Sequence, residues 1–281
     1  MAGTQQSLNL LTTDEGKQML ADRYAGVIEN LFKTLISMRC KNTDLSGTPD
    51  SGSVTAKRIA NATSKAYGTA RAAGKGDAVK DKDVVINIDT NREIVEELEA
   101  KDIGLGTVKD LVNRRTANHP LVMLAELDKA FFAVAAQAGV EVDVTEETTI
   151  SGKLEAIIQE CENTKNQFVE GVDRAQMFLT LNTKMYGEVR TDLDKTSRAN
   201  VDTAAEEFYA WHGVETVSCV NLPADVEAIL MVRGSVAQPV LANSYGLEKI
   251  GLSEAFALEL FYHYGTKAVS PDLIFVIKKA A

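Results

Sequence analysis

The longest helical pattern of hydrophobic positions in this chain runs through residues 108–139. Its apolar side chains recur at spacings of three and four, which places them on one face of a helix. That face is formed by Leu121, Leu124, Leu127, Phe131, Val134 and Ala138, widened by Val122, Ala125, Phe132 and Ala136, with Glu126, Asp128, Lys129 and Gln137 on the polar side. Asn118 and Pro120 are typical of a helix start and Gly139 of a helix end, so we expect a rod of about 28 Å, with separate turns at 108–116.

Residues 7–40 carry a second helical pattern, which predicts an amphipathic helical segment that packs on its own domain or on a neighbour. The stretch after it, KNTDLSGTPDSGS, is rich in Asn, Asp, Ser, Gly and Pro and predicts a loop.

Residues 54–82 are rich in Ala, Thr, Ser and Lys, and they hold too few large apolar side chains to build a core. One interpretation is a disordered linker. The other is a long two-stranded arm: residue types alternate over 54–60, AAGKGD supplies a glycine-rich tip, and DVVINID at 83–89 predicts the returning strand. An isolated hairpin is marginal in water, so such an arm would be held by contacts outside its own domain.

Mixed patterns follow the rod and predict an α+β protein. Helices are expected at 151–168, 183–193 and 202–210, and strands at 175–181, 214–220, 226–232 and 236–241. The alternating residues 256–264 and the apolar run 272–278 predict a closing hairpin long enough to lie along the rod. We therefore expect these last strands to cover the apolar face of the rod.

The composition, 45% hydrophobic and 25% charged over 281 residues, is that of an ordinary soluble protein of one large domain or two. The sequence contains no apolar run long enough to span a membrane, and its first residues lack the basic start and apolar centre of a secretion signal. The odd, widely spaced Cys40, Cys161 and Cys219 predict reduced thiols in a cytosolic setting.

The net charge of −10 argues against a protein that coats nucleic acid, but the charge is unevenly distributed. Residues 54–82 hold seven basic and two acidic side chains, a local charge of +5 that leaves −15 for the remainder. A basic segment on an acidic body has an obvious partner, which is another copy of the same body.

Candidate chemistry is sparse. His119, His212 and His263 lack a Cys, His or carboxylate neighbour at the spacing of metal ligands, so each is interpreted as structural. AAGKGD lacks the spacing of a phosphate loop, the GLG at 104–106 is a turn, and no GxSxG elbow occurs. We therefore predict no catalytic residue, no cofactor site and no metal site.

The order of parts, together with two stretches of sequence, resembles the major capsid proteins of tailed bacteriophages, which have the Hong Kong 97-type (HK97-like) fold. GSVTAKRIANATSKAYGTARAAGKGD followed by RRTANHPLVMLAELDKAFF is similar to the hairpin-to-helix region of one branch of that family, and ELFYHYGTKAVSPDLIFVIKK is similar to its final strands. The resemblance covers nearly the whole chain. It rests on the order of the parts and on their residue patterns, not on invariant residues.

This resemblance implies an N-terminal helical arm at 1–51, an extended β-hairpin loop (E-loop) at 52–90, and a peripheral domain at 91–139 and 252–281 with a long spine helix and long β-strands. It places an α/β axial domain at 140–251. In such proteins the extended loop lies on the adjacent subunit. The basic residues implied in inter-subunit contacts are Lys57, Arg58, Lys65, Arg71 and Lys75, and the possible acidic acceptors are Glu93, Glu96, Glu97 and Glu99.

The implied function is a structural one, without catalysis: self-assembly into hexamers and pentamers of an icosahedral or prolate head shell around phage DNA. The implied partners are copies of the chain itself, a portal protein and, because the first forty residues are short, a separate scaffolding protein. The implied location is the virion, assembled in the host cytoplasm, with no sequence-specific DNA binding and no membrane.

Three other functions remain open from the residues alone. An encapsulin-type cargo nanocompartment shares the fold and would be marked by a cargo-docking groove. A nucleic-acid-binding protein using the basic arm would bind DNA with a steep salt dependence, and an unrecognised α/β enzyme would be stabilised by a ligand.

Overall fold

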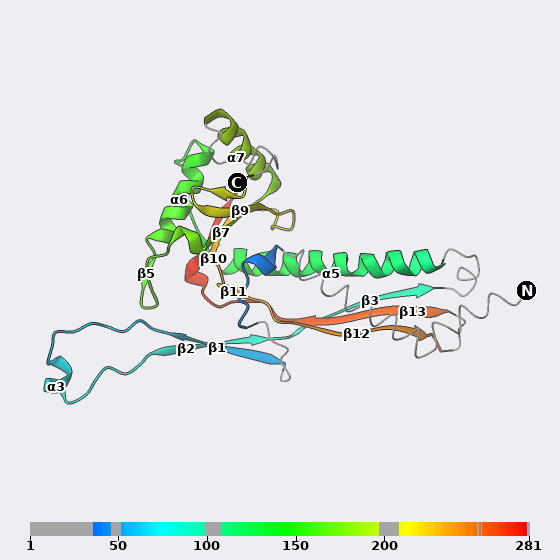
Figure 1. Cartoon of the computed structure of the whole chain (residues 1–281), viewed down its shortest axis with the longest axis horizontal. Helices are drawn as coiled ribbons and strands as arrows, with labels where there is room; N and C mark the ends of the chain where they lie inside the picture. The colour runs from blue at the N-terminus through cyan, green and yellow to red at the C-terminus, as the bar shows by residue number, and fades with distance from the viewer. Residues whose placement is uncertain are drawn as a thin grey trace, which may run out of the picture.

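The computed structural model describes residues 36–45, 52–98, 108–196, 208–251, 253 and 255–279. Within them the chain forms an α+β structure with three visible parts, a compact α/β body, a long helix lying along a narrow sheet, and a thin hairpin that projects from the base of both (Figure 1). Most of the helical segment expected at 7–40, and most of the helix expected at 202–210, fall outside the described residues.

The long helix α5 (Val108–Ala138) is one element of 31 residues, or about 46 Å at 1.5 Å per residue. The expected start at Pro120 is therefore wrong, because the helix continues through that proline. A proline inside a helix removes one backbone hydrogen bond to the preceding turn. Packing of the helix compensates for this lost hydrogen bond, and Pro120 itself lies buried.

Two sheets bury successive parts of the same face of α5. Met123 and Leu127 pack with Leu260, Tyr262 and Tyr264 of one sheet. Farther along, Phe131, Phe132 and Ala135 pack with Ile274 and Val276 of the other. The expectation that the closing strands cover the rod is thus confirmed.

The buried face of α5 is rotated from the predicted one. Leu121 and Val122, expected inside, are 59% and 47% exposed, while Asp128, expected on the wet side, is buried. Asp128 accepts hydrogen bonds from the backbone N and the Oγ of Ser37, at 3.2 Å and 2.7 Å. Burial raises the pKa of this carboxyl, and the bonds from Ser37 oppose the shift. The short helix η1 (Ser37–Arg39) is thereby fastened to α5.

The α/β body contains a six-stranded sheet in the order β4-β15-β10-β7-β9-β8. Its strands are β4 (Val140–Glu141), β7 (Met177–Leu181), β8 (Ala210–Trp211), β9 (Val214–Ser218), β10 (Val226–Val232) and β15 (Ile274–Lys278), and it is flanked by α6 (Ile150–Glu162) and α7 (Thr183–Thr196). The turns η2 (Arg174–Gln176) and η4 (Pro271–Leu273) lead into β7 and β15.

Alternation along three neighbouring strands sends successive side chains to opposite layers. Leu179, Leu230 and Ile277 lie in the cluster with α6 and α7, whereas Phe178 and Ile229 lie in the cluster with α5. Because both faces of the sheet are covered, VEAILMV reads as a continuous apolar run rather than an alternating one.

The second sheet has three strands in the order β12-β13-β3, formed by β3 (Thr90–Leu98), β12 (Val240–Lys249) and β13 (Phe256–Tyr264). The predicted closing hairpin is wrong, because β13 pairs with β12 and β3 while β15 pairs with β10 and β4. The chain between them passes through β14 (Lys267–Ala268), which pairs with β11 (Val236–Ala237), and so changes from one sheet to the other.

Candidate functional site: the projecting arm and its anchor

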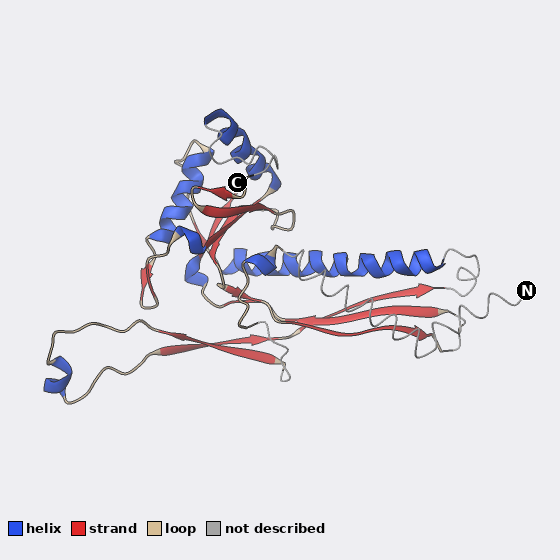
Figure 2. Ribbon diagram, viewed as in Figure 1, coloured by secondary structure: helices blue, strands red, loops and turns tan. Residues whose placement is uncertain are grey.

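The projecting hairpin, here called the arm, is formed by β1 (Ser53–Ile59) and β2 (Asp81–Asn87), which pair antiparallel from Ser53↔Asn87 to Ile59↔Asp81. The two-stranded interpretation of this basic stretch is therefore confirmed. At its far tip lies the short helix α3 (Thr69–Ala73), bounded by Gly68 and Gly74 at φ +92° and +69°, which L side chains rarely adopt (Figure 2).

Every residue from 61 to 83 is exposed. Tyr67 is 97% exposed and Val79 is 79% exposed, so the part of the arm beyond its strands presents large apolar groups to solvent. Exposed aromatic and aliphatic groups on a segment without a core of its own are typical of a surface that another molecule covers. The arm is thus the candidate functional site.

The base of the arm packs closely on its own chain. Ala56, Val84 and Ile86 are buried there. Lys267 Nζ donates a hydrogen bond to the backbone oxygen of Val85 at 2.8 Å. Gly265 approaches the backbone so closely that an added Cβ would lie 1.9 Å from the Asn87 oxygen, which explains glycine at this position.

A second contact holds the arm at Arg58, whose guanidinium donates to both carboxylate oxygens of Asp272 at 2.5 Å and 2.8 Å. Asn166 Nδ2 donates to the same carboxylate at 2.6 Å, and the Arg58 guanidinium lies 4.3 Å from the ring centroid of Phe168. Burial pushes the pKa of Asp272 upward, but the hydrogen bonds from Arg58 and Asn166 outweigh it and hold that pKa below its ordinary value.

The predicted basic contact residues thus differ in their surroundings. Lys57 pairs with Asp81 at 3.1 Å and with Asp83 at 3.6 Å, and Lys65 pairs with Asp77 at 2.6 Å, all within the arm. Arg71 and Lys75 lie exposed at the tip, with no ion pair to any residue of the described ranges. Arg58 differs from these lysines because it is bound outside the arm, by Asp272 of its own chain.

Three of the four predicted acidic residues lie on strand β3, and they point in two directions. Glu96 faces α5, where its carboxylate lies 3.1 Å from His119 Nε2. Glu93 and Glu97, three residues before it and one residue after it, lie on the opposite face and are exposed. Glu99 falls outside the described residues. Glu96 is therefore turned away from the open face that its neighbours share.

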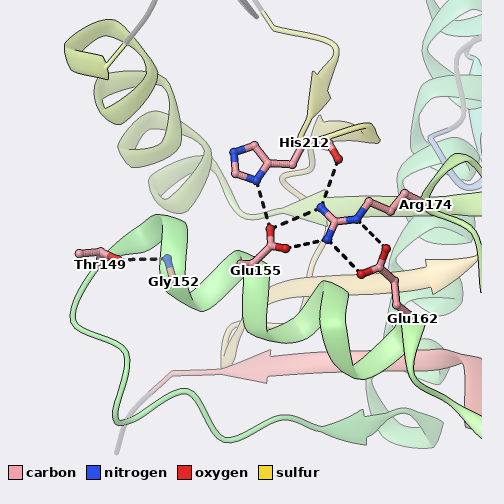
Figure 3. A network of polar contacts seen from close by, with 6 residues as sticks. All are labelled: Thr149, Gly152, Glu155, Glu162, Arg174 and His212. Atoms are coloured by element: carbon pink, nitrogen blue, oxygen red, sulfur yellow. Dashed lines mark hydrogen bonds and ion pairs between the residues drawn. The ribbon is translucent and has the colours of Figure 1, made fainter.

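A cluster of charged side chains fastens α6, η2 and the β8–β9 turn (Figure 3). Arg174 donates to Glu162 at 2.7 Å and to Glu155 at 2.6 Å, and His212 Nδ1 lies 3.1 Å from Glu155. The Arg174 hydrogen bond holds the pKa of Glu155 below its ordinary value, against the effect of burial. Both carboxylates are thus paired with the Arg174 guanidinium, which is typical of a structural ion-pair cluster.

Replacing Arg174 by methionine should lower the free energy of unfolding at pH 7 by about 1–3 kcal/mol, the cost of leaving partly buried acceptors without their hydrogen-bond donor. Because the folded-state pKa of Glu155 is lowered, its stabilisation is complete above the ordinary carboxyl value of 4.5 and is lost as the pH falls through the folded value. The difference between wild type and variant in denaturant titrations should therefore shrink in acid. Lys153→Met, on helix α6 beside Glu155, should leave the free energy of unfolding and its pH dependence unchanged.

Sequence reasoning missed the partners of the histidines. His119 and His212 each lie 3.1 Å from a glutamate, and His263 Nδ1 lies 2.7 Å from Asn91 Oδ1. These partners are remote along the chain, so no spacing motif could reveal them. The three cysteines are buried free thiols, and burial raises the pKa of Cys161 to about 12 and that of Cys219 to about 11.

Among the described ranges, no group of three or more His, Cys, Asp or Glu side chains is placed to hold a metal ion. Within those same ranges, no helix is long and apolar enough to cross a membrane.

No protein-family model matches the sequence, and no curated protein matches it either. Solved structures do match over most of the chain. A chain from Mycobacterium phage Che8 superposes with a TM-score of 0.65 at 17% identity, covering 88% of this chain and 90% of that one. The capsid of cyanophage P-SCSP1u gives 0.62 at 13% identity, with 83% and 85% covered.

The virus-like particle of Pyrococcus furiosus gives a TM-score of 0.57 at 11% identity, covering 90% of this chain and 96% of that one. The similarity spans 83–90% of this chain and 85–96% of the chains that it matches. The chain therefore has the Hong Kong 97-type fold of phage capsids and virus-like particles.

Proposed function

We propose that this chain is the major capsid protein of a tailed bacteriophage, which assembles into hexamers and pentamers of an icosahedral or prolate head shell around the phage DNA. The role is structural, without catalysis. One observation carries the proposal: residues 61–83 project from the body with every side chain exposed. An arm that covers nothing in its own chain is suited to lie on an adjacent copy.

The domain assignment expected from the resemblance is proposed with two boundary changes. Residues 1–51 are the N-terminal arm and 52–90 the extended loop. The peripheral domain combines α5 with β3, β12 and β13, so it takes in 240–249. The axial domain combines the six-stranded sheet with α6 and α7, so it takes in 274–278. The strand order of the two sheets supports both changes.

The open face of the three-stranded sheet is proposed to receive the arm of the next subunit. Glu93 and Glu97 are exposed there, and Glu259 shares this face because it stands opposite Val95 in the strand pairing. Arg71 and Lys75 at the tip supply the opposite charge. Charge complementarity of this kind steers two copies into register more than it adds affinity.

Copies of the chain itself are the main partners, with a portal protein and a separate scaffolding protein as further ones. The subunit is assembled in the host cytoplasm and resides in the virion. Its net charge of −10 supports a shell that encloses DNA without gripping it.

An encapsulin-type cargo compartment is the second candidate, favoured by the match to the Pyrococcus furiosus virus-like particle. Genes for a portal and a terminase beside the coding sequence would support the phage head, whereas a neighbouring cargo enzyme would support the compartment.

Purified full-length protein should form closed shells in negative-stain micrographs. The double variant Glu93→Lys/Glu97→Lys should instead remain as small oligomers, because it places like charges opposite the arm and like-charge contacts repel. Glu146→Lys/Glu160→Lys carries the same change of net charge on exposed residues of the body and serves as the control.

Wild-type protein that stays monomeric at high concentration would refute the capsid function. Shells from the Glu93/Glu97 variant, with the wild type also assembling, would refute only the receiving face.

A further inference from the structure

The arm contacts the rest of the chain at two separate places along its length, whereas attachment at one place would be enough for a hinge. The first is at the base, where Lys267 bonds to Val85 and Gly265 abuts Asn87. The second is Arg58, which pairs with Lys82 across the hairpin. Val85 and Asn87 pair with Thr55 and Ser53, so the base contacts lie three and five positions before Arg58 along β1, or roughly 10 Å and 17 Å at 3.3 Å per residue. Two fixed points that far apart define a direction, whereas one alone would allow the arm to swivel.

The second fastening is built from parts of the α/β body. The small hairpin of β5 (Lys165–Asn166) and β6 (Val169–Glu170) follows α6 and reaches toward the arm (Figure 1). Asn166 Oδ1 accepts the backbone N–H groups of Phe168 and Val169 at 2.8 Å and 3.0 Å, so its amide end is aimed at Asp272. The backbone N of Asn61 also donates to the Gln167 oxygen at 2.8 Å.

The contact at Arg58 has the features of a strong polar interaction. It is bidentate, and such Arg–carboxylate pairs fix geometry as well as energy. The side chains are only 15% and 27% exposed, so water screens them less than the Lys57 pair, in which lysine is 62% exposed. Phe168 covers the guanidinium face, which adds a cation–π contact.

We propose that Asp272 and the β5–β6 hairpin form a clasp on Arg58 that sets the direction in which the arm leaves the body. Arg58 is then a positioning residue and not a contact to the neighbour. The consequence for assembly rests on the proposed capsid function, because a fixed arm direction would set the angle between adjacent subunits. The clasp itself does not depend on that function.

The distance between arm and body tests the clasp directly. Spin labels at Ala73→Cys on the tip and Glu160→Cys on α6 would report it, because both sites are exposed and the native cysteines are buried. The measurement uses full-length subunits diluted below the concentration at which particles form. Electron–electron resonance should give a narrow distance distribution for the wild type. Arg58→Met should roughly double its width, since the remaining Asn61 bond is a single neutral one worth about 1 kcal/mol.

Two further variants make the test specific. Lys57→Met removes the adjacent cation, which pairs with Asp81 and Asp83 of the arm itself, and should leave the distribution narrow. The charge swap Arg58→Asp/Asp272→Arg should give a distance distribution narrower than that of Arg58→Met, though broader than that of the wild type. A distribution for Arg58→Met as narrow as the wild type, or equal broadening by Lys57→Met, would overturn the clasp.

Micrographs of the assembled particles then separate the clasp from the capsid proposal. Wild-type shells should have a uniform diameter and Arg58→Met shells a broad range of diameters. A wild type that forms no particles would refute the capsid function, while the spin-label distances would still decide the clasp. Uniform Arg58→Met shells would show that the clasp does not set shell geometry.

Discussion

Subunits whose arm is cut short are expected to fold normally and to lose assembly altogether. Ala60 N donates to the Lys80 oxygen at 2.9 Å, so replacing residues 61–79 by Asn-Gly would close the hairpin with a two-residue turn just beyond β1 and β2. No side chain from 61 to 83 is buried. The free energy of unfolding should therefore stay within roughly 0.5 kcal/mol of the wild-type value, as is typical of surface changes. The midpoint of thermal unfolding should be correspondingly close to that of the wild-type subunit.

Size-exclusion chromatography and negative-stain microscopy would follow the assembly of this shortened chain beside the wild type. We expect particles from the wild type and only small species from the variant, because the segment proposed to cover the next subunit is gone. Particles from the shortened chain would contradict the role of the arm. A shortened chain that fails to fold would contradict the conclusion that the body is complete without it.

The largest loss of stability is expected from Phe131→Ala in the long helix α5. Phe131 is fully buried, packs edge-to-face on Phe132 with ring centroids 5.3 Å apart, and lies in the cluster that joins α5 to the six-stranded sheet. Removing a buried phenyl ring costs about 3–5 kcal/mol through lost burial and the cavity left behind. The midpoint of denaturant unfolding of unassembled subunits should fall accordingly, with an unchanged slope.

Val122→Ala is the matched control, since it shortens an apolar side chain on the same helix that is 47% exposed. It should lower the free energy of unfolding by no more than about 0.5 kcal/mol, so the denaturant midpoint should move little. Equal effects of the two substitutions would mean that the face of α5 assigned to the core is the wrong one.

The periodicity of the sequence predicts single elements well and their pairing poorly. Strand β10 (Val226–Val232) and the arm strands were predicted, because alternation and apolar runs are local signals. The predicted closing hairpin is wrong, because β13 pairs with β3, which lies 166 residues away along the chain in the pair Leu260↔Ile94. Such pairings depend on which faces remain to be buried after the layers form, which no local window contains.

The charged residues show the same limit. Asp128 was predicted to be on the wet side because aspartate is rarely buried, yet the hydrogen bonds from Ser37 make its burial tolerable. Arg58 belonged to a basic run whose members look alike in sequence. Its partner Asp272 lies 214 residues away, so only the tertiary structure separates it from Lys57 and Lys65.

In the arm, the residues proposed for contact between copies are separate from the residues that stabilise the subunit fold. Substitutions within 61–83 remove no buried contact, so they leave the folding equilibrium of the subunit nearly unchanged. In the shell proposed above, the same substitutions would change the strength and selectivity of the contact between copies. This segment can therefore diverge, or be redesigned to carry a foreign peptide or a different partner preference, while the fold that bears it stays the same.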